Sequence, residues 1–371
     1  LPEDVKFGKG NPMETSKKFS EVKIKGKNYR RETDTMDTFF DSSWYFFRFT
    51  DAKNKNKLFD SRNANYWMPV DFYTGGAEHA CMHLIYARFF TKVLRDLGLI
   101  NKNLREPFKR LFNQGMVHGE DGYVMSKSRG NIIDPLTIVQ KYGSDSLRMF
   151  VVSMASPDSD FSWNTTGLES INKFLTKTFE YLSSVKIGNS DEKVQSKINK
   201  AIKEITGEIE NLRYNFAVIK LRELFGYLDG KELSKKDFES CIKILSPICP
   251  HFSEEMWEKN GNKGFVSIEE WPKCDEKKIN EKFEKEEKAI EQLVDDIKNI
   301  LKIMTERKKT AERVFVYTLP NEKEIFLSSK ENIERRIGLK IEIFAANDKN
   351  KYDPEKKSSK VKPGKPGIYI E

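Results

Sequence analysis

The sequence has few cysteines and histidines and no long apolar run. Its 371 residues include 4 cysteines and 4 histidines, and Cys81, Cys241, Cys249 and Cys274 form no CxxC pair. This argues against a disulfide framework and against a zinc ribbon. No stretch of about 18 consecutive apolar residues occurs, so no transmembrane helix is predicted, and no signal peptide opens the chain. We expect a cytoplasmic protein without membrane association.

The composition is that of a folded, unusually charged protein. Hydrophobic residues make up 38% and charged residues 33%, and 26 Phe, 13 Tyr and 5 Trp exclude disorder for most of the chain. One core rarely serves more than about 250–300 residues, so the length predicts two or three domains. The formal net charge of +8 weakly favours a polyanionic partner.

Residues 1–165 carry mixed strand and helix signals. The chain begins with Leu1 rather than Met, and LPEDVKFGKGNP reads as the interior of a longer protein. We interpret residues 1–36 as a connector that ends in short strands, with VKIKG the best candidate. Within 37–165, VDFYTGG predicts a buried strand, and EHACMHLIYARFFTKVLRDLG predicts a helix with Leu84, Ala87 and Leu94 near one face. Another helix is expected over DPLTIVQKYGSDSLRMFVVSM, starting at Asp134 and Pro135.

Residues 166–310 predict a helical bundle, and residues 311–371 a small α+β domain. Apolar residues recur at intervals of three and four in several segments between 167 and 260. A charged helix with one apolar stripe is expected over 281–309. RVFVYTL and KIEIFAA alternate with the period of strands, and KENIERRIG between them predicts a short helix.

The string VMSKSRGN, from Val124 to Asn131, is the sharpest local feature. Small residues let the backbone approach a ligand, and hydroxyl and N–H groups suit phosphate oxygens. Lys127 could neutralise charge that develops on a leaving phosphate. For a shorter string, a solvated loop that contains Lys and Ser would be the better interpretation.

The segment TGGAEHACMH places two glycines after a strand and before a helix. Gly75 and Gly76 would let a nucleoside lie against the backbone, and Glu78 could bind both hydroxyls of a ribose. His79 and His83 are four residues apart, which also allows a zinc site on one helix face. Zinc is disfavoured because no third ligand is suggested and the pattern is not HExxH. Taken alone, the segment would read as a glycine turn and core histidines.

An aromatic cluster lies in ETDTMDTFFDSSWYFFRF, residues 32–49. Phe40, Phe46 and Phe47 are interpreted mostly as core residues, and Trp44 is interpreted as a packing residue.

These three segments, in this order, resemble the leucyl-tRNA synthetases, a family of class I aminoacyl-tRNA synthetases. VMSKSRGN is similar to their KMSKS loop, with Val124 in place of the first Lys. Gly-Gly-x-Glu-His and DTF…SSWY favour the leucyl enzymes over the valyl, isoleucyl and methionyl ones. LSPICPHFSEEMWEKNG is similar to the anticodon-binding bundle, and the ending KYDPEKKSSKVKPGKPGIYIE to a small C-terminal domain. The resemblance implies half of a Rossmann-like α/β nucleotide-binding catalytic fold, then an α-helical anticodon-binding bundle and a small α+β domain.

The resemblance also shows what is missing. The class needs a His-x-Gly-His motif, yet no two histidines are three residues apart. The N-terminal half of the catalytic fold and the inserted editing domain are also missing. We therefore expect a subunit of a split enzyme or a fragment of a longer chain, with a separate N-terminal half as partner. Some family members bind zinc near the start of this region, but residues 21–31 contain no cysteine, so no zinc is predicted.

The resemblance assigns roles to residues of the catalytic half. Lys127 would be catalytic and follow the pyrophosphate, the backbone at Val124 and Met125 would face adenine, and Asn131 would hold the loop. The implied partners are ATP with Mg²⁺, leucine and tRNA(Leu). The implied ATP-binding residues are Gly75, Gly76, Glu78, Val124, Met125, Ser126, Lys127, Ser128 and Asn131. Those implied for leucine are Phe39, Ser42, Tyr45 and His79.

Basic residues of the bundle and tail are the expected RNA contacts, although a solvated helix face explains each about as well. They are Arg213, Lys220, Arg222, Lys356, Lys357 and Lys362. Two other functions stay open: a non-catalytic tRNA- or RNA-binding protein that reuses the architecture, and a zinc hydrolase that uses His79 and His83.

Overall fold

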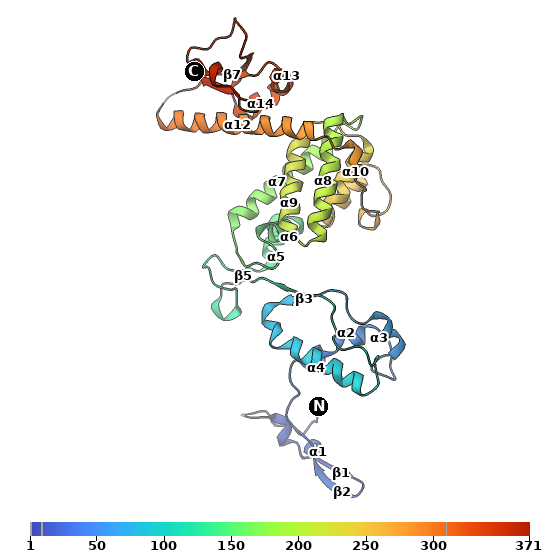
Figure 1. The fold of residues 1–371 in the computed structure, drawn as a ribbon. Helices are drawn as coiled ribbons and strands as arrows, with labels where there is room; N and C mark the ends of the chain where they lie inside the picture. The colour runs from blue at the N-terminus through green and yellow to red at the C-terminus, as the bar shows by residue number, and fades with distance from the viewer. Residues whose placement is uncertain (1, 9, 309) are drawn as a thin grey trace. The chain divides into compact units, whose positions relative to one another are not determined.

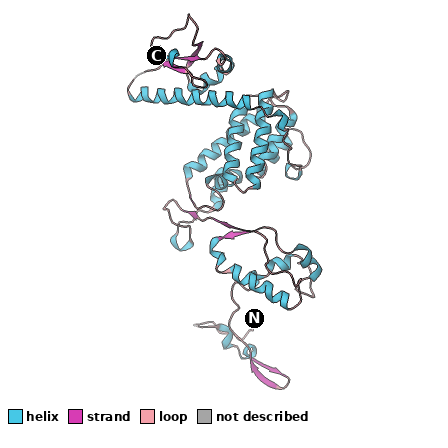
Figure 2. Cartoon of the chain, viewed as in Figure 1, coloured by secondary structure: helices cyan, strands magenta, loops and turns pink. Residues whose placement is uncertain are grey.

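A computed structural model describes residues 2–8, 10–308 and 310–371 of the chain. The chain forms two compact units (Figure 1). The first unit contains Leu1–Asp134 and Met154–Thr165, and the second contains Pro135–Ser153 and Thr166–Glu371. The order of elements agrees with the predicted α/β part, helical bundle and small α+β part, and most helices lie in the second unit (Figure 2). Among the described residues, no helix is long and apolar enough to cross a membrane.

The chain opens with a short helical segment and a hairpin. The elements are η1 (Pro12–Thr15), α1 (Lys17–Ser20), β1 (Glu21–Ile24) and β2 (Lys27–Arg30). The hydroxyl of Ser16 caps α1 by accepting from Phe19 N at 3.1 Å. The strand predicted at VKIKG is confirmed over Val22–Ile24, and Lys25 and Gly26 form the turn that follows.

The rest of the first unit has a helical core beside two pairs of parallel strands. Phe47, Ala64, Ala87 and Leu94 are among the residues buried in this core. β3 pairs with β4, and β5 pairs with β6. The helical elements are η2 (Asp41–Ser43), α2 (Tyr45–Phe49), α3 (Ser61–Trp67), η3 (Ala77–Ala80), α4 (His83–Asp96) and η4 (Lys127–Arg129). The strands are β3 (Tyr73–Gly76), β4 (Leu111–Gln114), β5 (Val117–His118) and β6 (Phe161–Ser162).

Two predictions for this unit are wrong in part. The strand at VDFYTGG is limited to Tyr73–Gly76 and is only partly buried, because β4 is its one paired neighbour in a two-stranded sheet. The helix starts at His83 rather than at Glu78, since residues 77–80 form a separate 3₁₀ turn. Its predicted buried face is confirmed at Leu84, Ala87 and Leu94.

The helix predicted from Asp134 is divided in two. α5 (Pro135–Tyr142) ends at Gly143, and α6 (Ser144–Met154) begins directly after it. Gly143 has φ +82°, a left-handed conformation that ends a helix and that side chains other than glycine rarely adopt. In the second unit, a carboxylate oxygen of Asp145 accepts from Phe252 N at 2.6 Å, which ties α6 to the first turn of α11.

The predicted bundle helices are confirmed, except that the segment KKDFESCIKILSPICPHFSEEMWEK forms two helices separated by residues 246–249. They are α7 (Thr165–Ser184), α8 (Glu192–Glu210), α9 (Tyr214–Leu228), α10 (Lys235–Leu245) and α11 (Pro250–Lys259), followed by η5 (Val266–Ile268) and η6 (Glu276–Lys278). Fully buried side chains include Ile205 on α8, Leu221 and Leu224 on α9, and Leu245 on α10. On α9, Leu221, Leu224 and Leu228 are spaced by three and four residues, which gives the helix one apolar face that packs inward.

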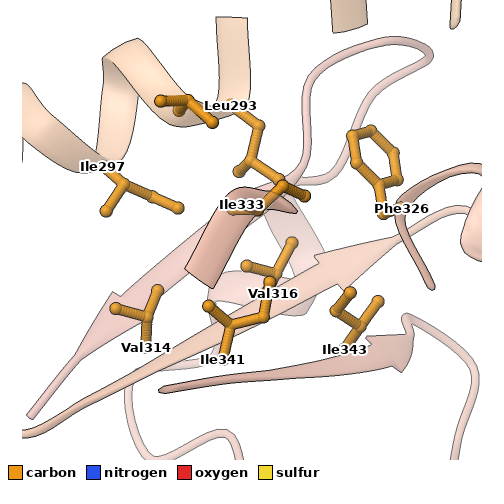
Figure 3. Close-up of a cluster of buried hydrophobic side chains, with 9 residues drawn as sticks. Leu293, Ile297, Val314, Val316, Phe326, Ile333, Ile341 and Ile343 are labelled. Atoms are coloured by element: carbon orange, nitrogen blue, oxygen red, sulfur yellow. The ribbon is translucent and has the colours of Figure 1, made fainter. Parts of the chain in front are cut away.

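Helix α12 (Glu281–Glu306) contacts both the bundle and the C-terminal sheet. Lys193 and Lys197 of α8 pair with Glu286 and Glu287 of α12 at 2.8 and 2.7 Å. Further along, Leu293, Val294 and Ile297 are fully buried against β7 and β8 (Figure 3). The sheet has the order β8-β7-β9, with β8 parallel and β9 antiparallel to β7. The elements of this C-terminal part are β7 (Arg313–Thr318), α13 (Lys323–Ser328), α14 (Lys330–Ile337), β8 (Lys340–Ala345), η7 (Lys357–Lys360) and β9 (Gly367–Ile370).

Candidate functional site

The glycine pair lies at the carboxyl end of a parallel strand. Gly75 and Gly76 are opposite Asn113 and Gln114 of β4, and the chain turns into η3 directly after Gly76. A Cβ atom at Gly76 would collide with the carboxylate of Glu78, so only glycine fits there without a shift. The carboxylate of Glu78 is about half exposed. This end of the strand therefore presents bare backbone and one accessible carboxylate.

Three of the four residues predicted for leucine are joined by contacts within this part. The ring of Phe39 meets the ring of His79 edge-on at 6.4 Å, and Ser42 Oγ donates to Phe39 O at 3.1 Å. Tyr45 is linked instead to β3, because its hydroxyl lies 2.8 Å from the Tyr73 hydroxyl. Trp44, predicted to be packing, stacks on Phe90 with ring centroids 6.3 Å apart.

The structure adds Tyr73 and His83 to this cluster. Neither was predicted to bind leucine or ATP, and His83 was named only in the zinc alternative. The hydroxyl of Tyr73 lies 2.7 Å from His83 Nε2, which completes a chain from Tyr45 to His83. Burial, then the hydrogen bond to Tyr45, raises the pKa of Tyr73. Burial, then the nearby His79, lowers the pKa of His83, which favours the neutral imidazole. No sequence signal marks Tyr73 beyond its place just before the glycine pair.

The geometry of these two histidines does not favour the zinc alternative. The rings of His79 and His83 are perpendicular, with centroids 6.2 Å apart, and Nε2 of His83 already faces Tyr73. Across the described ranges, no group of three or more His, Cys, Asp or Glu side chains could hold a metal ion. We therefore derive no step through a protein-bound metal.

The MSKS segment is a loop held in shape by Asn131. Asn131 Oδ1 accepts from Ser126 N at 2.9 Å, and Asn131 Nδ2 donates to Asp121 Oδ2 at 3.1 Å. Met125 N also donates to Val117 O at 3.1 Å, which ties the loop to β5. Gly130 ends η4 with φ +70°. Both ends of the loop are therefore fixed to the rest of the unit.

The middle of the loop is exposed. Lys127 and Ser128 are exposed, and Lys127 has no ion pair among the residues that the structure describes. Ser126 Oγ and Ser128 Oγ are 3.3 Å apart. The guanidinium of Arg129 lies 4.5 Å from the centre of the Tyr123 ring, which holds Arg129 and leaves Lys127 as the unpaired cation of the turn.

His118 on β5 and Asp160, just before β6, support this loop, and neither was predicted. His118 Nδ1 lies 2.9 Å from Gly122 O, and its Nε2 lies 3.4 Å from Asp160 Oδ2. The carbonyl of Gly122, then Asp160, raises the pKa of His118. The N–H of Met116, then His118, lowers the pKa of Asp160. The Asp-Gly turn at 121–122 is the signal that could have marked this support.

The glycine segment and the MSKS loop lie in the same compact unit. Within the described residues, no hydrogen bond, ion pair or ring contact joins one to the other. The chain thus carries two separate half-sites on consecutive strand pairs, each of which is internally ordered.

The residues predicted to contact RNA lie in the second unit, and most are already engaged. Arg213 pairs with Glu208 at 2.6 Å, Lys220 with Glu223 at 3.1 Å, and Lys357 with Glu355 at 3.1 Å. Arg222 lies over the Phe174 ring at 5.5 Å. Lys356 and Lys362 are exposed, and neither has an ion pair in the described part of the chain.

Comparison with known proteins identifies both parts of the chain. Residues 5–164 match the family described as tRNA synthetases class I (I, L, M and V), and residues 191–316 match the anticodon-binding domain of tRNA ligase. The leucine–tRNA ligase of Fusobacterium nucleatum subsp. nucleatum is 40% identical over an alignment of 342 residues, and the match covers 76% of this chain and 40% of that protein. That of Thermosipho melanesiensis is 41% identical over an alignment of 304 residues, and the match covers 74% of this chain and 36% of that protein.

A solved structure agrees with this match. The LeuRS of Agrobacterium radiobacter K84, in a ternary complex with tRNA and LeuAMS, superposes with a TM-score of 0.66 at 32% identity. The superposition covers 76% of this chain and 39% of that one. The chain thus spans about two fifths of the length of the curated relatives it matches.

Proposed function

We propose that the chain supplies the C-terminal part of a leucine–tRNA ligase. Its residues 5–164 match the class I tRNA synthetases (I, L, M and V), and its residues 191–316 match the anticodon-binding domain of tRNA ligase, which supports this proposal. The complete enzyme would activate leucine with ATP and transfer it to tRNA(Leu). The single observation that carries the proposal is the MSKS loop, which Asn131 fixes at both ends while Lys127 stays exposed and unpaired among the described residues.

The chemistry needs no protein nucleophile. A carboxylate oxygen of leucine forms a bond to the α-phosphorus of ATP, and the bond to the bridging oxygen breaks, so pyrophosphate leaves with the electron pair. The terminal ribose hydroxyl of tRNA then attacks the aminoacyl carbonyl, and AMP leaves. Positioning and electrostatic stabilisation supply the rate enhancement. Mg²⁺ carried by the ATP would neutralise phosphate charge.

The chain's own residues divide this work between the two half-sites. The bare backbone at Gly75 and Gly76, with the accessible Glu78 carboxylate, would hold the ribose. Lys127 would meet the charge that develops on pyrophosphate, and the backbone at Val124 and Met125 would face adenine. Ser126 and Ser128 would offer their hydroxyls to phosphate oxygens.

Leucine would lie beside the aromatic cluster. The edge contact between Phe39 and His79 gives an apolar wall, and the hydroxyls of Ser42 and Tyr45 are both engaged within the protein. An apolar pocket discriminates by only about 1–3 kcal/mol per methylene group. We therefore expect clear rejection of smaller side chains but weak rejection of isomers of leucine.

The missing His-x-Gly-His motif sets the test. The chain would be mixed with an N-terminal half that carries this motif, and leucine-dependent exchange of pyrophosphate into ATP would be measured. We expect exchange from the pair and none from this chain alone. Lys127→Ala should slow exchange by about 10²- to 10³-fold, whereas Lys102→Ala, at an exposed position after α4, should have no effect.

Lack of exchange from a well-folded pair would refute the proposal. Binding of tRNA by this chain, with no exchange under any pairing, would instead favour the non-catalytic RNA-binding function.

A further inference from the structure

The positive charge of the chain is concentrated in the N-terminal hairpin and the turn of helix before it. Residues 17–31 hold seven cations and one acid, a net charge of +6, whereas the whole chain carries +8. All seven cations are exposed. They are Lys17, Lys18, Lys23, Lys25, Lys27, Arg30 and Arg31, and the acid is Glu21. The remaining residues sum to +2, and within them residues 349–366 form a second basic segment with seven lysines and two acids. The hairpin is therefore one of two basic clusters that can attract a polyanion, and the one with the higher net charge.

These cations are not neutralised within the protein. None of the seven has a salt bridge within 4.0 Å in the ranges that the structure describes. The lysines of α8 differ in this respect, because Lys193 and Lys197 each face a glutamate of α12. Like charges on adjacent strands repel each other. A hairpin of this composition therefore gains stability when a polyanion binds it.

The register of the strands sorts the side chains into two faces. Val22 lies opposite Tyr29, and Ile24 opposite Lys27, so these four share one face. Glu21, Lys23, Asn28 and Arg30 share the other face. Ile24 and Tyr29 are each 51% exposed. One face thus joins an exposed aromatic ring to a cation, and the other presents two further cations.

The base of the hairpin is fixed to its surroundings. Arg31 N donates to Ser20 O at 2.7 Å, and Ser16 Oγ donates to Asp4 Oδ1 at 2.6 Å. Asn11 Nδ2 donates to Thr33 O at 2.6 Å. The turn at Lys25 and Gly26, where φ is positive at both residues, forms the tip, and the strands run out to it from α1 (Figure 1). The cations are thus held on an ordered scaffold rather than on a loose tail.

We propose that the β1–β2 hairpin is an RNA-binding arm. Lys23, Lys25, Lys27 and Arg30 bind backbone phosphates, and the ring of Tyr29 stacks on an unpaired base. Cations interleaved with an exposed aromatic ring suit single-stranded or looped RNA, where phosphate contact and stacking act together. The choice of RNA over an anionic lipid surface rests on the proposed function. The inference that the hairpin binds a polyanion rests on its charge and geometry alone.

The test is binding of fluorescent tRNA to the full chain, measured by anisotropy as a function of salt. A hairpin variant would replace Lys23, Lys25, Lys27 and Arg30 by Gln. The matched control, with the same loss of three lysines and one arginine at exposed positions of the same unit, would replace Lys53, Lys55, Lys57 and Arg105 by Gln. Circular dichroism and thermal unfolding would establish that both variants are folded.

We expect the hairpin variant to reduce the slope of log affinity against log salt by about 3, since each phosphate contact contributes about 0.7–0.9. The control should leave the slope unchanged. Tyr29→Ala should weaken binding by about tenfold with the slope intact, and Tyr29→Phe should restore it.

Several outcomes would overturn the proposal. They are wild-type slope and affinity in the hairpin variant, equal losses in the hairpin variant and the control, or no tRNA binding by the chain. If the hairpin variant lost binding to phosphatidylserine vesicles but still bound tRNA as the wild type does, the arm would be assigned to a membrane surface instead. Leucine-dependent pyrophosphate exchange needs no tRNA, so it tests the proposed function separately and should not change in the hairpin variant.

Discussion

Asn131 holds the backbone of Ser126 in place, because its side-chain Oδ1 accepts the Ser126 N–H at 2.9 Å. The same amide group donates through Nδ2 to the carboxylate of Asp121 at 3.1 Å. One side chain therefore joins the start of the MSKS loop to its end and to the preceding turn. The exposed residues between these points, including Lys127, depend on this clamp for their position.

Asn131→Ala should loosen the loop without unfolding the protein. Each lost hydrogen bond is worth about 0.5–1.5 kcal/mol, so amides at 119–131 should exchange with deuterium about tenfold faster. Asn103→Ala, at an exposed position in the same unit, is the control. Unchanged exchange in Asn131→Ala would mean that the backbone contacts of Met125 and Gly130 hold the loop by themselves.

His118 should titrate at a higher pH than His83. The carbonyl of Gly122, then Asp160, raises the pKa of His118, whereas burial lowers that of His83. With 4 histidines in the chain, the imidazole signals can be resolved by NMR. Asp160→Asn should lower the pKa of His118. An unchanged value in this variant would show that the contact at 3.4 Å carries no charge interaction.

The same shift makes the loop sensitive to pH. Because the pKa of His118 is raised in the folded state, its contacts with Gly122 and Asp160 stabilise the loop fully below the unfolded pKa of about 6.5. This stabilisation is lost as pH rises through the folded pKa of His118. Proteolysis within 115–131 should therefore be slower at pH 6 than at pH 8.5. His118→Gln should remove the difference between the two pH values.

The ion pairs between α8 and α12 should make the second unit sensitive to salt. Lys197 and Glu287 are 2.7 Å apart and only 20% and 24% exposed in their side chains. A double-mutant cycle to Ala should give a coupling of about 1 kcal/mol in dilute buffer and less in 0.5 M salt. The exposed pair Lys186 and Glu232, at 75% and 47%, should show almost none. Equal couplings for the two pairs would contradict this account.

Ile297→Ala should strongly destabilise the C-terminal part. Ile297 is fully buried between α12 and the sheet, whereas Ile303 on the same helix is 48% exposed. We expect a loss of about 2–5 kcal/mol in the free energy of unfolding for Ile297→Ala, and less than about 0.5 kcal/mol for Ile303→Ala. Urea unfolding measures both. Similar losses would mean that α12 does not pack on the sheet.

The helical half of the molecule was predictable because its signal is local. Leu221, Leu224 and Leu228 of α9 recur at spacings of three and four residues, and that spacing alone decides which face is buried. The break at Gly143 was missed, since an isolated glycine can also lie within a helix and only its φ of +82° shows that it ends one. β3 was predicted to be buried because Val70, Phe72 and Tyr73 are apolar, but burial of a strand depends on neighbours far along the chain.

The candidate site was predictable only where it follows a motif. Glu78, Lys127 and Asn131 were found through short strings of sequence, and their roles stay predictions. The supporting residues could not be found in this way. Tyr73 meets His83, and His118 meets Asp160, across 10 and 42 residues of sequence. Such pairs form only when the chain folds, and they cannot be predicted from the pattern of a single sequence.

Helix α12 also decides how the chain can be divided. It forms one wall of the C-terminal core, so a piece that starts at β7 would leave Val314, Val316 and Ile341 open to water. A piece that ends before β7 would leave Leu293, Val294 and Ile297 in the same condition, and either would be prone to aggregate. A piece that carries the C-terminal core must therefore include α12 from Ala289 to Leu301, whereas the turns before it, which pair with α8, belong to the bundle.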